Sequence, residues 1–375
     1  MFLARSILGY FILLLVFAMA CNEKNIQELD YSITPYPIKT GYDGTNFYFN
    51  YTLQNTDSGE YIYYYDHLMK RISIVDFDNK EIIDHIPLNN DKYEIKGVGE
   101  IILSDTSLIL RNMNWFYWVS NDGLVQNYAD PETFKGMRFK DEFDYTFGYK
   151  TSYQNHINKS EDIIQFSKFP SNYDKNHFSK SRLVKVFLNK DSIINSNEPL
   201  DFSNYKNENE TFGFRSNPFI ISMNNEVYVT YPFTPDIHIY NRDDLSLEMT
   251  VELSNYDELP NNKPITIAKF KEITEENFQN ETPLDDQTYY HNLYYDPYRE
   301  LFYRPVKREI LEHEEVMDYK MWLLIFNQDM ELLGKLDLED KFSPFLYISK
   351  KGLFIRKKKQ QENRIDLHRI DFELP

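Results

Sequence analysis

Cysteine is almost absent from the sequence, with Cys21 the single example among 375 residues. A disulfide within the chain is therefore excluded, as is a metal centre built from several cysteines. Glycine is also scarce, with 12 residues, which argues against a fold that holds a nucleotide in a glycine-rich loop. Positive charge is in deficit, because the formal net charge is −18. Nucleic acid is not an expected partner, since phosphate binding needs a clustered positive field.

Recognised motifs for catalysis or metal binding are lacking too. The chain has no His-Glu-x-x-His motif, no phosphate-binding glycine loop and no Gly-x-Ser-x-Gly elbow. The densest group of potential metal ligands, residues 312–315, contains one histidine and is interpreted as a solvated loop. Residues 76–79 lack the glycine and distal glutamate of a calcium loop, so a hairpin turn is favoured. No cofactor is predicted, and a non-enzymatic role is favoured over catalysis.

Aromatic residues are abundant instead, with 30 Tyr and 28 Phe, and they favour strands because flat rings pack well on a pleated surface. The clearest unit spans residues 289–338 and predicts four antiparallel strands in two hairpins. Asp296-Pro297-Tyr298-Arg299 has the composition of a tight turn. The predicted strands are residues 290–295, 300–306, 321–326 and 331–338, with a charged insert at 307–318.

Less complete copies of this unit recur along the chain. They are predicted at residues 47–86, 100–128, 145–191 and 219–253, followed by a polar insert at 254–286 with a short helix around 274–278. The third strands of three copies are followed by Asn189-Lys190-Asp191, Asn241-Arg242-Asp243 and Asn327-Gln328-Asp329. Such side chains bond their own backbone in turns, so their phase with the strands indicates a repeat.

The two ends of the chain complement each other. The last copy, residues 345–372, has three predicted strands, whereas residues 31–38 form a strand-like segment before the first copy. A closed ring leaves no strand edge unpaired, and the N-terminal strand can supply the missing fourth strand. The sequence therefore predicts an all-β fold: one six-bladed β-propeller domain over residues 29–375, with the N-terminal strand completing the C-terminal blade. A seventh blade is left open in case the insert at 254–286 contains strands.

The N-terminus has the pattern of a targeting signal. Residues 7–20 form an apolar run of 14 residues after Arg5. As a helix this run reaches about 21 Å, less than the ~30 Å hydrocarbon core of a bilayer. Residues 1–20 are therefore interpreted as a signal peptide. The ending Ala18-Met19-Ala20-Cys21 resembles a bacterial lipoprotein signal, with Cys21 acylated and residues 21–28 as a lipidated tether. The alternative is an ordinary signal or uncleaved anchor in which Cys21 is incidental.

Taken together, the chain resembles the uncharacterised lipoproteins of Bacteroidota that carry a six-bladed, TolB-like propeller domain. The residues that carry the resemblance are Ala18 to Cys21 and the strand–turn segment 292–299. The resemblance implies a lipid-anchored location in the cell envelope, expected at the outer membrane, with the periplasmic or surface face left open. It supplies no catalytic residues.

Candidate ligand-binding residues come from the loops and inner strands of the predicted ring. His291 lies near Asp285 and Asp286, at one mouth of the channel if 290–295 is an innermost strand, and such a histidine can titrate near neutral pH. Arg215 and Arg304 are candidates for reading an anionic ligand. Trp115 and Trp118 offer stacking faces for a sugar or peptide. For each of these residues the alternative is a structural role, in ion pairing or in core packing.

These observations predict a non-enzymatic binding or scaffolding module attached to the membrane through its N-terminal lipid. Its protein or glycan partner is not identified by the sequence. The alternative is a glycan-binding protein or carbohydrate-active enzyme with its site at a channel mouth. Two carboxylates about 5 to 10 Å apart at that mouth would favour a glycosidase.

Overall fold

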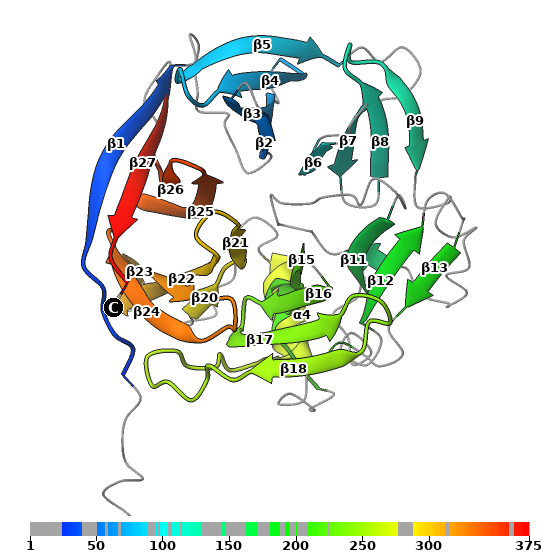
Figure 1. Cartoon of the computed structure of the whole chain (residues 1–375). Helices are drawn as coiled ribbons and strands as arrows, with labels where there is room; N and C mark the ends of the chain where they lie inside the picture. Colours follow the sequence, from blue (N-terminus) through cyan, green and yellow to red (C-terminus); the bar gives the residue numbers. More distant parts are fainter. Residues whose placement is uncertain are drawn as a thin grey trace, which may run out of the picture.

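The computed structural model describes residues 25–39, 51–56, 59–66, 69–88, 95, 98, 100–103, 107–112, 115–129, 145–147, 163–170, 181–187, 192–195, 200, 209–223, 225–276, 288–312, 315–359 and 364–374. In these residues the chain is nearly all β-structure. Figure 1 shows the sheets arranged as a propeller-like ring, with β2, β6, β15 and β21 toward the centre and β5, β9, β13, β18 and β24 along the rim.

Most sheets are antiparallel meanders of consecutive strands. They comprise β2 (Tyr51–Thr56), β3 (Gly59–Asp66), β4 (Arg71–Asp76) and β5 (Glu81–Pro87); β6 (Glu100–Leu103), β7 (Ser107–Asn112), β8 (Trp115–Ser120) and β9 (Val125–Ala129); and β10 (Tyr145–Phe147), β11 (Ile163–Pro170), β12 (Arg182–Phe187) and β13 (Ser192–Asn195). The chain continues with β15 (Phe219–Met223), β16 (Glu226–Tyr231), β17 (Thr234–Asn241) and β18 (Leu247–Val251); β20 (Thr288–Tyr290), β21 (Tyr294–Asp296), β22 (Leu301–Glu312), β23 (Glu315–Phe326) and β24 (Leu332–Leu338); and β25 (Phe342–Ser349), β26 (Gly352–Lys357) and β27 (Arg364–Phe372).

The two ends of the chain close the ring. β1 (Tyr31–Lys39) pairs antiparallel with β27 along its whole length, and Lys39 also pairs with Glu81 of β5. Figure 1 shows β1 and β27 side by side. Phe77, fully buried beyond β4, stacks on Tyr36 at 5.1 Å between ring centroids and meets Phe354 edge-on at 5.0 Å. The prediction that the N-terminal strand completes the C-terminal group is confirmed.

The unit at residues 289–338 differs from its prediction in two places. Residues 307–318 are not an insert: β22 and β23 pair from Phe302↔Phe326 to Glu312↔Glu315. Charged side chains do not interrupt a ladder that satisfies the backbone groups. The predicted strand 290–295 is divided into β20 and β21. The division lies opposite Pro305, whose missing N–H cannot complete the ladder.

The insert at 254–286 also differs from its prediction. Its helix, α4 (Ile267–Glu276), begins earlier than the predicted 274–278. The Thr266 hydroxyl accepts a hydrogen bond from the Lys269 backbone N–H at 3.2 Å, a helix cap that sets this earlier start. Before the helix, β14 (Glu210–Thr211) pairs with β19 (Ile265–Thr266).

The predicted turns are present where the structure describes them. Asp296 accepts hydrogen bonds from the backbone N–H groups of Tyr298 and Arg299. The Asn241 side chain accepts the backbone N–H of Asp243 at 2.8 Å, and Asn327 accepts that of Glu331 at 2.8 Å. The Asp76 turn is a hairpin between β4 and β5, as predicted. The third Asn-x-Asp turn, residues 189–191, lies outside the described residues.

A short N-terminal segment packs on the ring ahead of β1. Ile26 and Leu29 are buried, and the Leu29 N–H donates to the Lys335 carbonyl of β24 at 2.9 Å. The Lys335 N–H donates in turn to the Gln27 carbonyl at 2.9 Å. A Cβ at Gly334 would lie 2.8 Å from that Gln27 oxygen, so glycine permits the approach. Packing thus begins at Ile26, inside the predicted tether.

Candidate functional site

The structure places the predicted site residues in different parts of the molecule. Cys21, Asp285 and Asp286 lie outside the described residues, as does the side chain of Trp115. Trp118 is partly buried in β8, whose sheet lies across the ring from β20–β24 (Figure 1). His291, Arg304 and Arg215 are brought together near β20.

Arg304 on β22 is fully buried and binds the backbone of the neighbouring sheet. Its Nη2 donates to the Tyr231 and Thr234 carbonyls at 2.9 and 3.0 Å, and its Nη1 donates to the Pro235 carbonyl. Its Nε donates to the His291 carbonyl at 3.2 Å. Burial lowers the pKa of Arg304 to about 9, so it is still protonated at neutral pH. These contacts make Arg304 a clamp between β16–β17 and β20–β22, not the anion reader predicted.

His291 lies in the break between β20 and β21, where residues from three sheets meet. Its ring is 4.5 Å from the Tyr289 ring and 6.4 Å from the Phe345 ring of β25. The Arg215 guanidinium, in the 3-10 turn η3 (Gly213–Ser216) ahead of β15, lies 5.5 Å from the Tyr289 ring centroid. Lys307 is the ladder partner of Tyr289. These five residues, Arg215, Tyr289, His291, Lys307 and Phe345, are called the His291 cluster.

The electrostatics of the cluster are positive. Burial, and after it the charges of Lys307, Arg304 and Arg215, lower the pKa of His291 to about 3. The imidazole is therefore neutral at physiological pH. Its Nε2 atom is buried and has no hydrogen-bond partner among the described residues. Native structures leave few buried polar atoms unsatisfied, so this nitrogen is available to a water molecule or to a ligand atom.

The low pKa of His291 predicts a pH dependence of stability. The unfolded chain takes up a proton near pH 6.5, whereas the folded chain does so only near pH 3. The stability of the wild type is therefore lost as pH falls through this window, by about 1.4 kcal/mol per pH unit. The substitution His291→Phe keeps an aromatic ring in place and removes this pH-dependent loss of stability. From pH 7 to 4.5, the wild-type free energy of unfolding should fall by about 3 kcal/mol more than that of the variant. Urea titrations at each pH measure this difference. If the free energies of unfolding of the wild type and the variant fell in parallel with pH, the buried environment of His291 would be contradicted.

The positive character continues away from the centre. Lys307 lies 3.9 Å and Lys358 lies 4.6 Å from the ring centroid of Tyr319, so two cations from adjacent sheets contact one ring. The Lys358 backbone N–H donates to the Lys341 carbonyl at 2.9 Å, which places Lys341 beside this pair. Lys341 forms an ion pair with Glu339 at 2.6 Å. The His291 cluster therefore adjoins a basic, aromatic surface on a chain of net charge −18.

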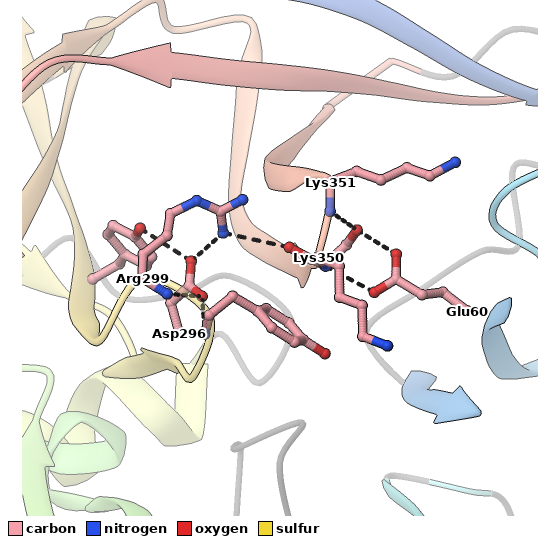
Figure 2. A network of polar contacts seen from close by, with 8 residues as sticks. Glu60, Asp296, Arg299, Lys350 and Lys351 are labelled. Carbon is pink, nitrogen blue, oxygen red and sulfur yellow. Dashed lines mark hydrogen bonds and ion pairs between the residues drawn. The ribbon is translucent and has the colours of Figure 1, made fainter. Parts of the chain in front are cut away.

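A second polar group lies where β21 and β25 end, and Figure 2 shows it from close by. Asp296 is fully buried, and its carboxylate accepts from Arg299 Nη1 at 2.5 Å and from the Tyr303 hydroxyl at 3.2 Å. Arg299 also donates to the Ser349 carbonyl at 3.4 Å, across to the next sheet. We call this group, with Glu60, Lys350 and Lys351, the Asp296 network.

Glu60 on β3 extends the Asp296 network to a third group of strands, β2–β5, which the pairing of β1 with β5 joins to β25–β27. Its carboxylate accepts the Ser349 hydroxyl at 2.6 Å and the Lys350 backbone N–H at 2.8 Å. The Lys351 ammonium pairs with Asp78, whose pKa this contact lowers. Both buried carboxylates, Asp296 and Glu60, thus bind groups of the protein itself. The Asp296 network joins the sheets on either side of the ring closure.

Sequence reasoning missed most of the residues around these sites. Phe345 and Lys307 carried no signal, because each lies in a different sheet or strand from His291. Glu60 and Ser349 are 289 residues apart. Among the described residues, no group of three or more potential ligands is placed to hold a metal ion. No helix in the described part of the chain has the length and apolar character needed to cross a membrane.

Comparison with known proteins gives one clear likeness. A family model for a domain of unknown function, DUF4221, matches residues 37–335. The crystal structure of a DUF4221 member from Bacteroides vulgatus aligns with a TM-score of 0.66 at 12% identity, covering 94% of this chain and 100% of that one. A protein from Bacteroides fragilis named as exported aligns with a TM-score of 0.48 at 7% identity, covering 93% and 97%. A search of curated proteins finds no match.

Proposed function

The chain belongs to the DUF4221 family, a domain of unknown function, and from this premise we propose that it is a lipid-anchored envelope protein whose ring is a binding module. The ring is a six-bladed β-propeller in this proposal. Five groups of consecutive strands, plus β25–β27 completed by β1, support this number of blades. The ligand-binding end is the one that carries the His291 cluster.

One observation carries the binding role. The Tyr289 ring of β20 and the Phe345 ring of β25 approach His291, and Arg215 of η3 approaches Tyr289. The buried Nε2 of His291 has no partner among the described residues. Side chains from adjacent blades meeting near the centre of a ring form the kind of place where such folds bind ligands. The Asp296 network, in contrast, is satisfied by its own contacts and serves to join blades.

A binding screen with the full-length protein in a non-ionic detergent tests the proposal. The protein is presented to a glycan array and to extracts of envelope proteins, beside two variants. Arg215→Glu reverses a charge in the His291 cluster, and Lys350→Glu makes the same change in the Asp296 network. We expect to find a ligand that binds to the wild type and to Lys350→Glu but does not bind to Arg215→Glu. Equal retention by all three proteins would contradict the proposed site.

The membrane attachment rests on Cys21 and on the packing of the segment that follows it. Packing begins at Ile26, five residues after Cys21. Five residues reach at most about 17 Å. A lipid on Cys21 would therefore hold the β24 side of the ring close to the membrane surface.

Replacing Cys21→Ala should release the protein from membranes, because the acylated thiol is the anchor in this proposal. We expect the variant to move to the soluble fraction and to lose incorporation of a labelled fatty acid. Cell fractionation and acyl labelling measure the two effects. A Cys21→Ala protein that still partitions fully with membranes and still takes up label would rule out the lipoprotein assignment.

The glycosidase alternative has less support. Glycoside hydrolysis uses two carboxylates facing the sugar. The buried carboxylates of the Asp296 network are bound to arginine, tyrosine, serine and backbone groups of the protein. The positive His291 cluster suits the binding of an acidic glycan better than its hydrolysis, and so a glycan is kept as a ligand class.

A further inference from the structure

Resting on the binding role above, we propose that the His291 cluster binds an oxyanion, a carboxylate or phosphate carried on a small molecule such as an acidic sugar. The site would lie between η3, β20 and β25, with Arg215 and Lys307 flanking His291.

The charges around His291 select for an anion. Arg215 lies 5.5 Å from the ring centroid of Tyr289, the neighbour of His291, and Lys307 is the ladder partner of Tyr289. Arg304 is close to His291 as well, but its guanidinium is engaged by backbone carbonyls. These are the charged groups that act on His291 in the described residues. A positively charged ligand would be repelled by these groups. An oxyanion would be attracted, and more strongly than in water because the surroundings are partly buried.

The neutral imidazole supplies a directional contact. In the tautomer that carries its proton on Nε2, His291 has one hydrogen-bond donor at that atom, which is buried with no partner among the described residues. An oxyanion oxygen satisfies this donor while it lies near the flanking cations. Charge-assisted hydrogen bonds of this kind are about twice as strong as neutral ones.

Aromatic rings lie in the His291 cluster beside the cations, and they suit a ligand that has a flat apolar face as well as a negative charge. The ring centroids of Tyr289 and Phe345 lie 4.5 and 6.4 Å from that of the histidine. The Lys307–Tyr319–Lys358 contact extends this surface outward. Flat apolar faces beside positive charge match a sugar ring that carries an acidic group. The net charge of −18 would repel the same ligand over much of the remaining surface.

Calorimetric titration of the full-length protein in a non-ionic detergent tests this inference. The probes are glucuronate for the carboxylate, glucose 6-phosphate for the phosphate, and glucose as the neutral control. We expect at least one acidic probe to bind and glucose not to bind. Tighter binding of glucuronate would identify the oxyanion as a carboxylate, and tighter binding of glucose 6-phosphate would identify it as a phosphate. Arg215→Gln and His291→Phe should each weaken binding about tenfold or more, since each loses one charge-assisted contact.

The matched control is Lys350→Gln, which removes a cation from the Asp296 network and should change affinity by less than about twofold. Circular dichroism confirms that each variant is folded. Two results would overturn the inference: folded wild type that binds neither acidic probe, or binding that Arg215→Gln and His291→Phe leave unchanged. A neutral ligand found in the screen above, lost on Arg215→Glu, would preserve the binding module and refute the oxyanion.

Discussion

Replacing Arg304→Met should lower the free energy of unfolding by about 4 kcal/mol, because it leaves several buried carbonyls without a donor. The affected oxygens belong to Tyr231, Thr234, Pro235 and His291. Methionine fills part of the volume but donates no hydrogen bond. The loss falls at the boundary between β15–β18 and β20–β24, so both sheets should loosen together. Guanidinium denaturation followed by tyrosine fluorescence measures the change.

Arg369→Met is the control for this prediction. Arg369 is partly exposed on β27 and pairs with Asp371 at 2.9 Å, a contact open to solvent. Exposed pairs of this kind contribute about 0 to 1 kcal/mol. If Arg304→Met were no more destabilising than Arg369→Met, Arg304 would not be the clamp described.

Deleting residues 31–39 should cost more still, because β1 is the strand that closes the ring. The deletion removes the full ladder with β27 and the buried Ile38, and it exposes Phe77 and Phe354. It also leaves β27 as an unpaired edge, which favours aggregation. We expect the cooperative thermal transition to be lost, or its midpoint to fall by roughly 10 °C or more.

A synthetic peptide with the sequence of residues 31–39 provides the matching experiment. Added to the deleted protein, it should restore part of the transition by strand addition. The same peptide with Ile38→Asp should not, because it would bury a charge in a site where Ile38 is fully buried. An unchanged thermal midpoint after the deletion would show that β1 does not close the ring.

Strand positions were predictable because their cause is local. Alternation of apolar residues and turns rich in Asn, Asp and Pro gave the hairpins, and the count of strands gave the pairing of β1 with β27. The extension of β22 and β23 through a charged segment was not predictable in this way. Its ladder is held by backbone pairing, to which side-chain charge gives no clue.

The candidate site was predictable only in part. His291 and Arg215 were singled out from their position near predicted inner strands, and the structure brings them together through Tyr289. The role of Arg304 was missed, because most of its carbonyl partners lie about 70 residues earlier, where β16 ends and β17 begins. The residue type shows that a side chain is charged. Only the assembled ring shows whether that charge is already bonded to groups of the protein, as the guanidinium of Arg304 is.

The nitrogen resonances of the His291 imidazole provide the most direct test of the central claim, that the His291 cluster is the ligand site. The protein is labelled with ¹⁵N-histidine, His291 is assigned with His291→Phe, and glucuronate or glucose 6-phosphate is added at pH 7. The account predicts that the Nε2 resonance moves with an acidic probe in the wild type and in Lys350→Gln, and moves much less in Arg215→Gln. A resonance that neither acidic probe moves at saturating concentration, or that glucose moves equally, would contradict it.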